Sequence, residues 1–388
     1  MIDKTKKILK MSVSLLKYYY YSIECFITKR DNSQVWLISE RGVDARDNGY
    51  WLYRYVRDNY PEINVKYVIS RESADRKKIL KGDIVNYGSR EHFLLFKTAG
   101  LLISTHIMGY SPEMSLFSRM DKRGLLRLKG KKVFLQHGIT CAFHPLLNKD
   151  STNLDLFVTC SEQECNFIKE NNGYDDKVVK CTGFCRYDHL IDDSTATCKR
   201  ILIMPTFRKW LNYVNDFVAT DYYKHWSGLL NDDGFIHYVE SNNIEVLFYP
   251  HYEIQRRLDC FSSRSKNIVI CSFDEYDVQD LLRKANVLIT DYSSVQFDFA
   301  YMNKKVIYYQ FDEKRFYEEH YKKGYFDFRK MGFGKVCIDI REVIDDLTTS
   351  LAKVYLMRRK SFFRYHDNEN SKRVFNEIQE LINEEQAR

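Results

Sequence analysis

The stretch Ala285-Asn-Val-Leu-Ile-Thr-Asp-Tyr-Ser-Ser-Val-Gln-Phe-Asp-Phe-Ala300 decides the fold of this chain. Its apolar run at residues 287–289 is typical of a buried parallel strand. The run stops at Thr290-Asp291, and Ser293 and Ser294 follow where a helix would begin. Serine is a good N-cap, and the free N–H groups and dipole of a helix start favour an anion. This pattern predicts a phosphate-bearing ligand at the carboxyl edge of a sheet.

Three further segments share this arrangement, in which an apolar strand runs directly into polar side chains. They are Phe134-Leu-Gln-His-Gly-Ile-Thr140, Ile201-Leu-Ile-Met-Pro-Thr-Phe-Arg208 and Phe248-Tyr-Pro-His-Tyr-Glu253. Asp and Ser after one strand often only cap the turn, so one such segment is weak evidence. Four strand ends with His, Thr, Arg, Asp and Ser together predict a binding site at a sheet edge.

Strand and helix patterns alternate along the chain from residue 35 onward, which indicates βαβ units and parallel sheets. A polar stretch at residues 192–197 interrupts the pattern and predicts a domain junction. The predicted domains are a basic amphipathic helix at 1–30, an α/β domain at 31–195 and a second α/β domain at 196–388. The predicted strands are 35–39, 65–69, 83–86, 101–105, 133–135, 156–159 and 178–181, then 201–204, 245–249, 267–270, 287–289, 305–309 and 335–338, and long helices are predicted at 341–357 and 368–385.

The polar strand ends resemble the motifs of the CDP-glycerol glycerophosphotransferases, which are teichoic-acid primases and polymerases and their relatives in capsule synthesis. The matching segments are Gln136-His-Gly-Ile-Thr140, Pro205-Thr-Phe-Arg208, Pro250-His251 and Thr290-Asp-Tyr-Ser-Ser294, with Asp298-Phe-Ala and Tyr309-Gln-Phe-Asp312. They cover roughly residues 34–345. The sequence departs at Ile139, where many members carry Gly-Thr-Pro after the His, and at Tyr249-Pro-His-Tyr, where many have Arg-x-His-Pro. The resemblance implies a GT-B-like α/β fold, in which two doubly wound Rossmann-type domains face a cleft.

His137 is the candidate general base, because an imidazole has a pKa near working pH and could take a proton from an acceptor hydroxyl. A single His after a strand is more often structural, and it is the resemblance that favours the catalytic role. His251 is the second catalytic candidate, since it could donate to a phosphate oxygen and stabilise a leaving cytidylate. On the acceptor side, Gly138, Thr140, Arg46 and Asn48 are the candidate contacts.

The donor-binding candidates follow the strands of the second predicted domain. The planar guanidinium of Arg208 carries five donors that match phosphate oxygens, and Thr206 could add a hydroxyl. Phosphoryl transfer depends mostly on positioning and charge stabilisation, so such donors suffice without a metal cluster. No metal and no other cofactor is therefore assigned. The remaining donor candidates are Ser293 and Ser294 for the pyrophosphate, Asp298 for a glycerol hydroxyl, and Asp291 for a hydroxyl or simply as a cap of the turn.

The first 30 residues predict a basic amphipathic helix. Leu9, Val13, Leu16, Tyr20, Ile23 and Ile27 recur at helical spacing, and seven basic side chains outnumber two acidic ones for a net charge of +5. Together with the aromatic run at 18–21, this pattern is typical of a helix that lies on a membrane surface. The alternatives are packing on its own domain or on a second subunit, which leaves a homo-oligomer open.

Composition excludes several classes of protein. The formal net charge is +7 over 388 residues, which favours anionic partners in general, and no nucleic-acid-binding module is present. The ten cysteines lack zinc-knuckle spacing, and neither a secretory signal nor a membrane span is evident. We therefore expect a cytoplasmic protein, peripheral at the inner face of the cell membrane.

Three functions remain open at this stage. The first is transfer of glycerol phosphate from CDP-glycerol to a hydroxyl of a glycan, teichoic-acid, capsule or lipid-linked polymer acceptor, with release of CMP. The second is a CDP-ribitol phosphotransferase or a nucleotide-sugar glycosyltransferase of cell-surface polysaccharide synthesis. The third is a non-catalytic scaffold in a polysaccharide-assembly complex, although a scaffold has no need to keep His137, His251, Arg208 and the serine pair together.

Overall fold

The computed structural model describes residues 2–195 and 199–386, with side chains for 8–195 and 199–384. Two compact units divide the chain. The first contains residues 1–139, 143–189 and 364–388, and the second contains 140–142 and 190–363. Each unit is built around its own parallel sheet.

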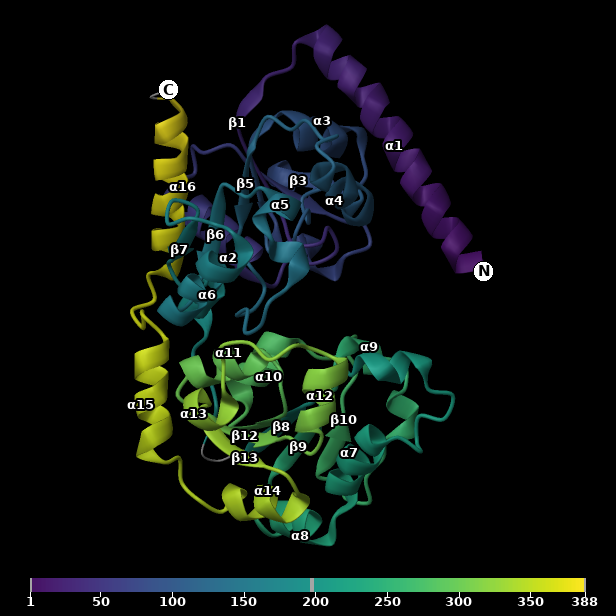
Figure 1. Cartoon of the computed structure of the whole chain (residues 1–388), viewed down its shortest axis with the longest axis vertical. Helices are drawn as coiled ribbons and strands as arrows, with labels where there is room; N and C mark the ends of the chain where they lie inside the picture. Colours follow the sequence, from purple (N-terminus) through teal and green to yellow (C-terminus); the bar gives the residue numbers. More distant parts are fainter. Residues whose placement is uncertain (1, 196–198, 387–388) are drawn as a thin grey trace. The chain divides into compact units, whose positions relative to one another are not determined.

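The sheet of the first unit has seven parallel strands in the order β3-β2-β1-β4-β5-β6-β7 (Figure 1). The strands alternate their side chains between two faces, so neighbouring residues of β1 pack on different helices. Leu37 packs with Phe93 and Phe96 of α3, whereas Trp36 contacts Phe375 of α16. The strands are β1 Asn32–Ser39, β2 Val65–Ile69, β3 Ile84–Asn86, β4 Ala99–Ser104, β5 Lys131–Phe134, β6 Leu156–Thr159 and β7 Val179–Cys181, and the helices are α1 Ile2–Thr28, α2 Asn48–Asn59, α3 Arg90–Thr98, α4 Met114–Lys122, α5 Lys149–Thr152, α6 Glu162–Asn172 and α16 Asn370–Gln386.

The sheet of the second unit has six parallel strands in the order β10-β9-β8-β11-β12-β13. One face packs on α7, α8 and α14 through Trp226, Phe235 and Val343, and Phe297 of α11 packs on Phe362 of α15. The strands are β8 Arg200–Met204, β9 Glu245–Phe248, β10 Ile268–Ile270, β11 Val287–Thr290, β12 Lys305–Tyr309 and β13 Gly334–Cys337, and the helices are α7 Asp221–Asn231, α8 Asp233–Ser241, α9 Tyr252–Gln255, α10 Val278–Lys284, α11 Val295–Tyr301, α12 Glu313–Glu319, α13 Phe328–Met331, α14 Ile340–Leu347 and α15 Lys353–Phe362.

Both sheets have doubly wound topology, which confirms the predicted α/β fold with two Rossmann-type domains. In each sheet the first strand lies in the middle, the next two extend to one side and the fourth lies on the other side. The direction of winding therefore reverses between β1 and β4 and again between β8 and β11. Ligands of such sheets bind beyond the carboxyl ends of the strands at this reversal. This rule directs attention to the segments that follow these four strands.

The predicted domain boundary is wrong at the C-terminal end of the chain. Residues 364–388 belong to the first unit and not to the second, because α16 buries Val374, Phe375 and Ile378 there. Figure 1 shows α16 beside α2 and β7. The units divide after His189, slightly before the predicted junction, of which residues 196–198 lie outside the described part of the chain.

The single helix predicted at 341–357 is also wrong, because two helices, α14 and α15, occupy this region. Between them, the hydroxyl of Thr348 donates to the carbonyl of Asp345 at 2.7 Å, and the hydroxyl of Thr349 donates to that of Asp346 at 2.9 Å. Such local bonds compete with helix propagation, so α14 ends after Leu347.

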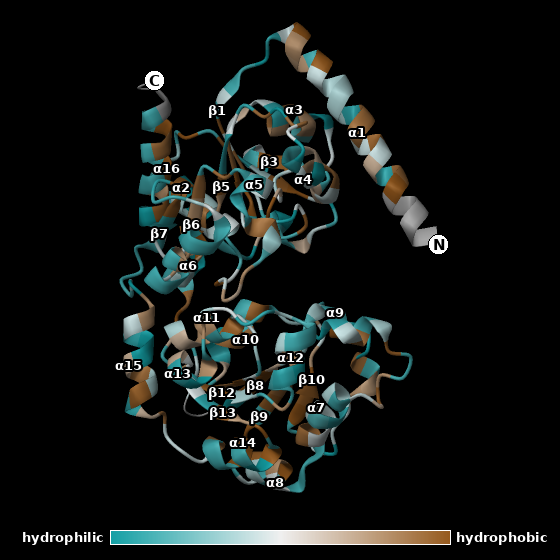
Figure 2. Cartoon of the chain, in the orientation of Figure 1, coloured by the Kyte–Doolittle hydropathy of each residue, from teal (hydrophilic) through white to brown (hydrophobic). Residues whose placement is uncertain are grey.

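The N-terminal helix is confirmed as α1, which packs on its own unit with one face. Tyr18 is buried between Phe96 and Phe117, with ring centroids 6.4 and 5.4 Å away. The opposite face carries the stripe identified in the sequence, and all six of its members are exposed. Apolar residues recur along the coloured part of α1 in Figure 2. No helix in the described part of the chain is long and apolar enough to cross a membrane.

Candidate functional site

The first unit brings Glu40, His106 and His137 to one edge of its sheet. They follow the adjacent strands β1, β4 and β5, whose last residues are in register: Ser39 pairs with Ser104, which pairs with Phe134. The winding reversal between β1 and β4 lies at this edge. The predicted base therefore occupies the place where doubly wound sheets bind ligands.

A strained turn presents His137. The residue before it, Gln136, has a φ of 57°, in the left-handed region that residues other than glycine rarely adopt. The Gln136 amide donates to Val158 O at 2.7 Å and to a carboxylate oxygen of buried Glu164 at 3.0 Å. These bonds hold the backbone in a conformation that costs energy, and such conformations cluster at functional sites.

The hydrogen bonds of His137 define which ring nitrogen can act as a base. Nδ1 lies 3.3 Å from Thr105 O, and a carbonyl oxygen can only accept, so Nδ1 carries the proton. The lone pair is then on Nε2. Although the side chain is exposed, partial desolvation by the surrounding protein lowers the pKa of His137 below its ordinary value, so that the ring is neutral near pH 7. A neutral imidazole with a free Nε2 is able to take a proton.

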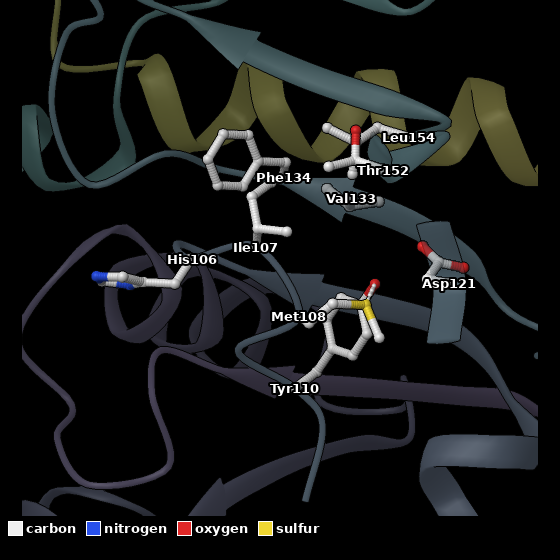
Figure 3. A pocket seen from close by; sticks show the side chains of 9 residues that line it. All are labelled: His106, Ile107, Met108, Tyr110, Asp121, Val133, Phe134, Thr152 and Leu154. Carbon is white, nitrogen blue, oxygen red and sulfur yellow. Dashed lines mark hydrogen bonds between the residues drawn. The ribbon is translucent and has the colours of Figure 1, made fainter. Parts of the chain in front are cut away.

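His106 stacks on His137 with ring centroids 4.4 Å apart and an angle of 9° between the rings. Burial lowers the pKa of His106 to about 2, with a further contribution from His137, so this ring is also neutral. Behind it lies a cavity of only about 10 Å³, shown in Figure 3, where the His106 ring points away from Asp121 at the opposite end. A cavity of this size holds about one water molecule and no substrate.

Asn48, a predicted acceptor contact, has a different place. It is fully buried, and its amide donates to Leu135 O at 3.2 Å and Gln136 O at 2.8 Å. Its Oδ1 accepts from the backbone N–H of Arg186 at 3.0 Å. With its side chain bonded to the main chain on both sides, Asn48 cannot contact an acceptor, and that prediction is wrong. It fixes the segment that presents His137.

The other predicted acceptor residues, Arg46, Gly138 and Thr140, do not form one group in the structure. Arg46 is half exposed, and its Nε donates to Asp75 at 2.6 Å. Gly138 follows His137 in the first unit, whereas Thr140 groups with the second unit. Their acceptor contacts stay predictions.

Three more residues belong to this edge: the sequence indicated Glu40 and Asp47 only as plausible acceptor contacts after the first strand, and it did not indicate Arg186. Buried Glu40 accepts backbone N–H groups of Arg46, Asp47 and Tyr50, and burial, aided by Asp47 and Asp44, raises its pKa to about 8. Buried Arg186 donates to Asp47 at 2.9 Å. The signal for Glu40 and Asp47 was their place between β1 and α2, where Glu40 directly follows the strand and Asp47 is the N-cap of the helix. Arg186 follows β7 by several residues and carried no comparable signal.

The second unit brings four strand ends together in the same way. The backbone N–H of Thr206, after β8, donates to Asp291 Oδ1, after β11, at 2.9 Å. The backbone N–H of His251, after β9, donates to Pro205 O at 3.3 Å. Gln310, after β12, donates to Asp291 O at 2.9 Å. These four strand ends thus form one cluster at the winding reversal of the sheet.

Arg208 is the centre of this cluster and is not available to a ligand. Its guanidinium has no exposed surface and contacts Asp291 at 2.9 Å and Asp312 at 2.8 and 3.0 Å. A further donor reaches Thr206 O at 2.8 Å. Burial opposes the charge on Arg208, but Asp291 and Asp312 outweigh it and raise its pKa above the ordinary value. The predicted direct contact of Arg208 with a donor is wrong here, because Asp291 and Asp312 already occupy its guanidinium. Buried Asp291 has the other role predicted for it, since its Oδ1 accepts the backbone N–H groups of Thr206 and Tyr292 and so orders the turn.

His251 has the opposite proton arrangement to His137. Its Nδ1 accepts from the backbone N–H of Glu253 at 3.3 Å as the N-cap of α9. Burial lowers the pKa of His251, so the ring is neutral near pH 7 and its proton lies on Nε2. The His251 Nε2–H group is therefore a hydrogen-bond donor, as the predicted contact with a phosphate oxygen requires.

The hydroxyl groups of the cluster differ in accessibility. Thr206 Oγ1 is buried and has no hydrogen-bond partner in the part of the chain that the structure describes. Ser294 is exposed and Ser293 is half buried, but Ser294 makes no capping bond to α11. Asp298 is buried on α11. The phosphate contacts of the hydroxyl groups and the glycerol contact of Asp298 stay predictions.

His320 is a further residue that the sequence did not indicate. It is buried next to the cluster, where its Nδ1 accepts the backbone N–H of Lys209 at 2.9 Å. Burial, together with Arg208, Lys209 and His251, lowers its pKa to about 3. Phe207 lies between the two rings, 5.9 Å from His251 and 6.2 Å from His320. Because His320 follows α12 rather than a strand, its place at this edge depends on tertiary packing.

No group of three or more His, Cys, Asp or Glu side chains that could hold a metal ion occurs among the described residues. The nine cysteines within these residues are free thiols.

Comparison with known proteins gives a match over most of the chain. Residues 19–380 match the family model of the CDP-glycerol:poly(glycerophosphate) glycerophosphotransferases. The minor teichoic acid biosynthesis protein GgaB of Bacillus subtilis is 33% identical over 376 residues, which are 91% of this chain and 40% of GgaB. The teichoic acid ribitol-phosphate polymerase TarL of Staphylococcus aureus is 30% identical over 167 residues, which are 39% of this chain and 28% of TarL. The chain thus spans less than half the length of either relative.

The fold has a close counterpart among solved structures. The wall teichoic acid polymerase TagF superposes with a TM-score of 0.68 at 16% identity, over 99% of each chain. At this identity the likeness establishes the fold alone.

Proposed function

Since the chain belongs to the CDP-glycerol:poly(glycerophosphate) glycerophosphotransferase family, we propose that it transfers glycerol phosphate from CDP-glycerol to a hydroxyl group of a teichoic-acid or related glycan acceptor. The acceptor oxygen would attack the phosphorus that carries glycerol. The bond from this phosphorus to the oxygen bridging the two phosphates breaks, and CMP leaves. The hydroxyl proton passes to a general base.

The observation that carries this proposal is the opposite proton arrangement of the two candidate histidines. His137 has its proton on Nδ1, towards Thr105 O, and offers the Nε2 lone pair. His251 accepts on Nδ1 from Glu253 N and offers an Nε2–H group. Transfer to a hydroxyl requires one group that accepts a proton and another that stabilises charge on the leaving phosphate. Each histidine has the protonation that its role demands.

For binding of CDP-glycerol, the second sheet supplies uncharged groups that donate hydrogen bonds. We assign the pyrophosphate to His251, Ser293, Ser294 and the Thr206 hydroxyl, which is buried but, unlike Arg208, has no hydrogen-bond partner among the described residues to give up. Arg208 acts through this cluster, because it fixes Asp291, which in turn holds the backbone of Thr206. Phosphoryl transfer is mostly positioning and charge stabilisation, so a rigid set of donors serves it.

Incubation of the chain with CDP-glycerol and a teichoic-acid oligomer tests the proposal. We expect CMP release and growth of the oligomer by glycerol-phosphate units, with much slower reaction of CDP-ribitol and UDP-sugars. EDTA should leave the rate almost unchanged if no metal takes part. Nucleotide release without acceptor growth, or no turnover of any donor, would contradict the proposal, and the latter outcome would favour a scaffold.

CDP-ribitol is the second candidate donor. The match to TarL, a ribitol-phosphate polymerase by name, favours it. Ribitol carries two more hydroxyl groups than glycerol, so the two donors differ in what lies beyond the second phosphate. The same assay decides between them through the ratio of their kcat/KM values.

We further propose that α1 places the protein on the inner surface of the cell membrane. One face of α1 packs on α3, and the other exposes the stripe that includes Leu9, Leu16 and Ile23. Sedimentation with vesicles that contain anionic phospholipid tests this, because deletion of residues 1–30 should abolish binding and salt should weaken it. Equal sedimentation of both forms would indicate that the stripe meets protein instead.

A further inference from the structure

A cavity of about 650 Å³ lies in the first unit, where α1 and α3 both end. Its lining combines Phe26 and Ile27 of α1 with four basic side chains: Lys29, Arg30, Lys97 and Lys129. The carboxyl-edge site of this sheet does not include any of these residues. The cavity is therefore separate from the proposed catalytic groups and large enough for a small organic ligand.

The four basic side chains have no ion-pair partner among the residues that the structure describes. Two acidic groups of the neighbouring segments have other partners: Glu24 pairs with Arg90, and Asp31 accepts from Ser33, although the charge of Lys129 also helps to lower the pKa of Asp31. Lys97 is partly buried, with its ammonium 5.2 Å from the centre of the Tyr18 ring. Burial lowers the pKa of Lys97, against a smaller opposing effect of Cys25. Four cations around one cavity favour an anionic ligand.

The helix ends alone do not explain this lining. The C-termini of α1 and α3 carry partial negative charge, which favours cations in their last turns. That effect accounts for Lys97 and Lys29, which lie in or directly after these turns. It does not account for Lys129, which precedes β5, or for an open cavity with exposed apolar side chains beside the charges.

The apolar part of the lining continues along α1. Phe26 and Ile27 are highly exposed, and Ile23, Tyr20 and Leu16 extend the same exposed stripe towards the N-terminus. A ligand that meets both surfaces needs an anionic head and an apolar tail. A soluble phosphate compound would satisfy only the cations.

We propose that this cavity binds the phosphate headgroup of an anionic membrane phospholipid, with the acyl chains along the exposed stripe of α1. Oxygens of the phosphodiester would accept from Lys97, Lys129 and Arg30, which are charge-assisted hydrogen bonds. The inference rests on the proposed membrane contact of α1 and goes beyond it, because it assigns a discrete site for one headgroup. It does not depend on the transfer reaction.

Titration with a short-chain lipid, dihexanoyl phosphatidylglycerol below its micelle concentration, tests the site without a membrane. We expect saturable binding of one lipid per full-length chain. The double variant Lys97→Gln/Lys129→Gln should bind at least about tenfold more weakly, since each basic group near an anionic lipid strengthens binding about fivefold. The matched control is Lys122→Gln/Arg123→Gln, which removes the same charge from the neighbouring end of α4, outside the lining. This control should bind within about twofold of the wild type.

Three further measurements keep the result decisive. Arg30→Gln is a milder variant in case the double variant unfolds, which thermal unfolding will show. Glycerol phosphate and inorganic phosphate should compete poorly, and tight binding of either would assign the cavity to a soluble anion and overturn the proposal. Equal loss in both double variants, or no saturable binding, would overturn it too. CMP release with a soluble acceptor should be unchanged in all these variants, so a failed lipid site is distinguishable from a failed transferase assignment.

Discussion

At the scale of single residues, the proposed function depends on where two protons lie. His137 and His251 both follow an apolar strand, yet one donates through Nδ1 and the other accepts there. The difference follows from the backbone group that each ring meets, a carbonyl at Thr105 and an N–H at Glu253. The sequence could indicate the two positions but not the proton arrangement, which depends on these tertiary and capping contacts.

His137→Ala should reduce the rate of transfer by roughly 10²–10⁴-fold, which is what loss of a general base usually costs. Binding of CDP-glycerol should change little, because the proposed pyrophosphate contacts belong to the second sheet. Single-turnover kinetics and calorimetry with CDP-glycerol measure the two quantities separately. A parallel loss of donor affinity would show that His137 binds the donor rather than acting as the base.

The pH profile should also identify this base. Desolvation lowers the pKa of His137, so the ring stays neutral and active at more acidic pH than an ordinary histidine. The acid limb of kcat/KM for the free enzyme should therefore have its midpoint below about pH 6.5. Measurement of kcat/KM between about pH 4.5 and 8 checks this. A midpoint above the ordinary histidine value would assign the limb to another group.

Arg208→Met should destabilise the second unit by about 3–5 kcal/mol, because it leaves the buried carboxylate of Asp291 without its cation. Arg256→Met is the matched control, since Arg256 is exposed and its Glu253 partner lies 3.9 Å away. The control should cost about 0–1 kcal/mol. Denaturant unfolding of both variants measures the free energy of unfolding. Equal losses would mean that the buried ion pairs of Arg208 with Asp291 and Asp312 add no stability.

The interpretation of Arg208 from the sequence was wrong for a reason that applies to strand ends in general. Its position after β8 predicted a cation at the sheet edge, and the structure places one there. Which anion meets it depends on β11 and β12, which contribute Asp291 and Asp312 from positions 83 and 104 residues further along the chain. Sequence order alone could not show that two carboxylates already occupy the guanidinium.

At the scale of secondary structure elements, the segment after β5 depends on the first residue of α2. Asn48→Ala removes the amide that holds Leu135 O and Gln136 O. We expect kcat to fall about ten- to a hundredfold through misplacement of His137, with the KM for the donor unchanged. Asn59→Ala is the control on the same helix, where the exposed amide bonds only Tyr55 O. A purely structural role would lower stability and leave kcat unchanged in the remaining folded protein.

Elements that lie within one continuous apolar pattern were predictable. The strands β2, β6 and β12 have their predicted bounds, since their side chains form short buried runs between polar turns. The break between α14 and α15 could not be predicted, because the helical pattern of the sequence continues across Thr348 and Thr349. Only the bonds from these hydroxyl groups back to Asp345 and Asp346 show where the helix stops.

At the scale of the whole molecule, the sequence indicated two α/β units but placed the last helix in the wrong one. Because α16 follows the second sheet in the sequence, chain order favours packing on that sheet, yet α16 packs on the sheet of the first unit. Specific contacts hold it there: Asp188 accepts the backbone N–H groups of Asn370 and Ser371 at 2.8 and 2.7 Å. Gly183 allows this approach, because a Cβ there would lie 2.0 Å from Asn370 Oδ1. No periodicity within α16 encodes which sheet it meets.

Phe375→Ala tests this assignment, because Phe375 stacks on Tyr60 at 4.1 Å and contacts Trp36 of β1 at 5.8 Å. Loss of such a buried ring typically costs about 3–5 kcal/mol, and here the whole cost should fall on the first unit. Hydrogen exchange measured by mass spectrometry resolves the two units: exchange should rise in β1 and α2 and stay unchanged in β8 and β11. Asn376→Ala, at an exposed position of the same helix, should leave both units protected. Faster exchange in β8 and β11 after Phe375→Ala would instead show that α16 stabilises the second sheet.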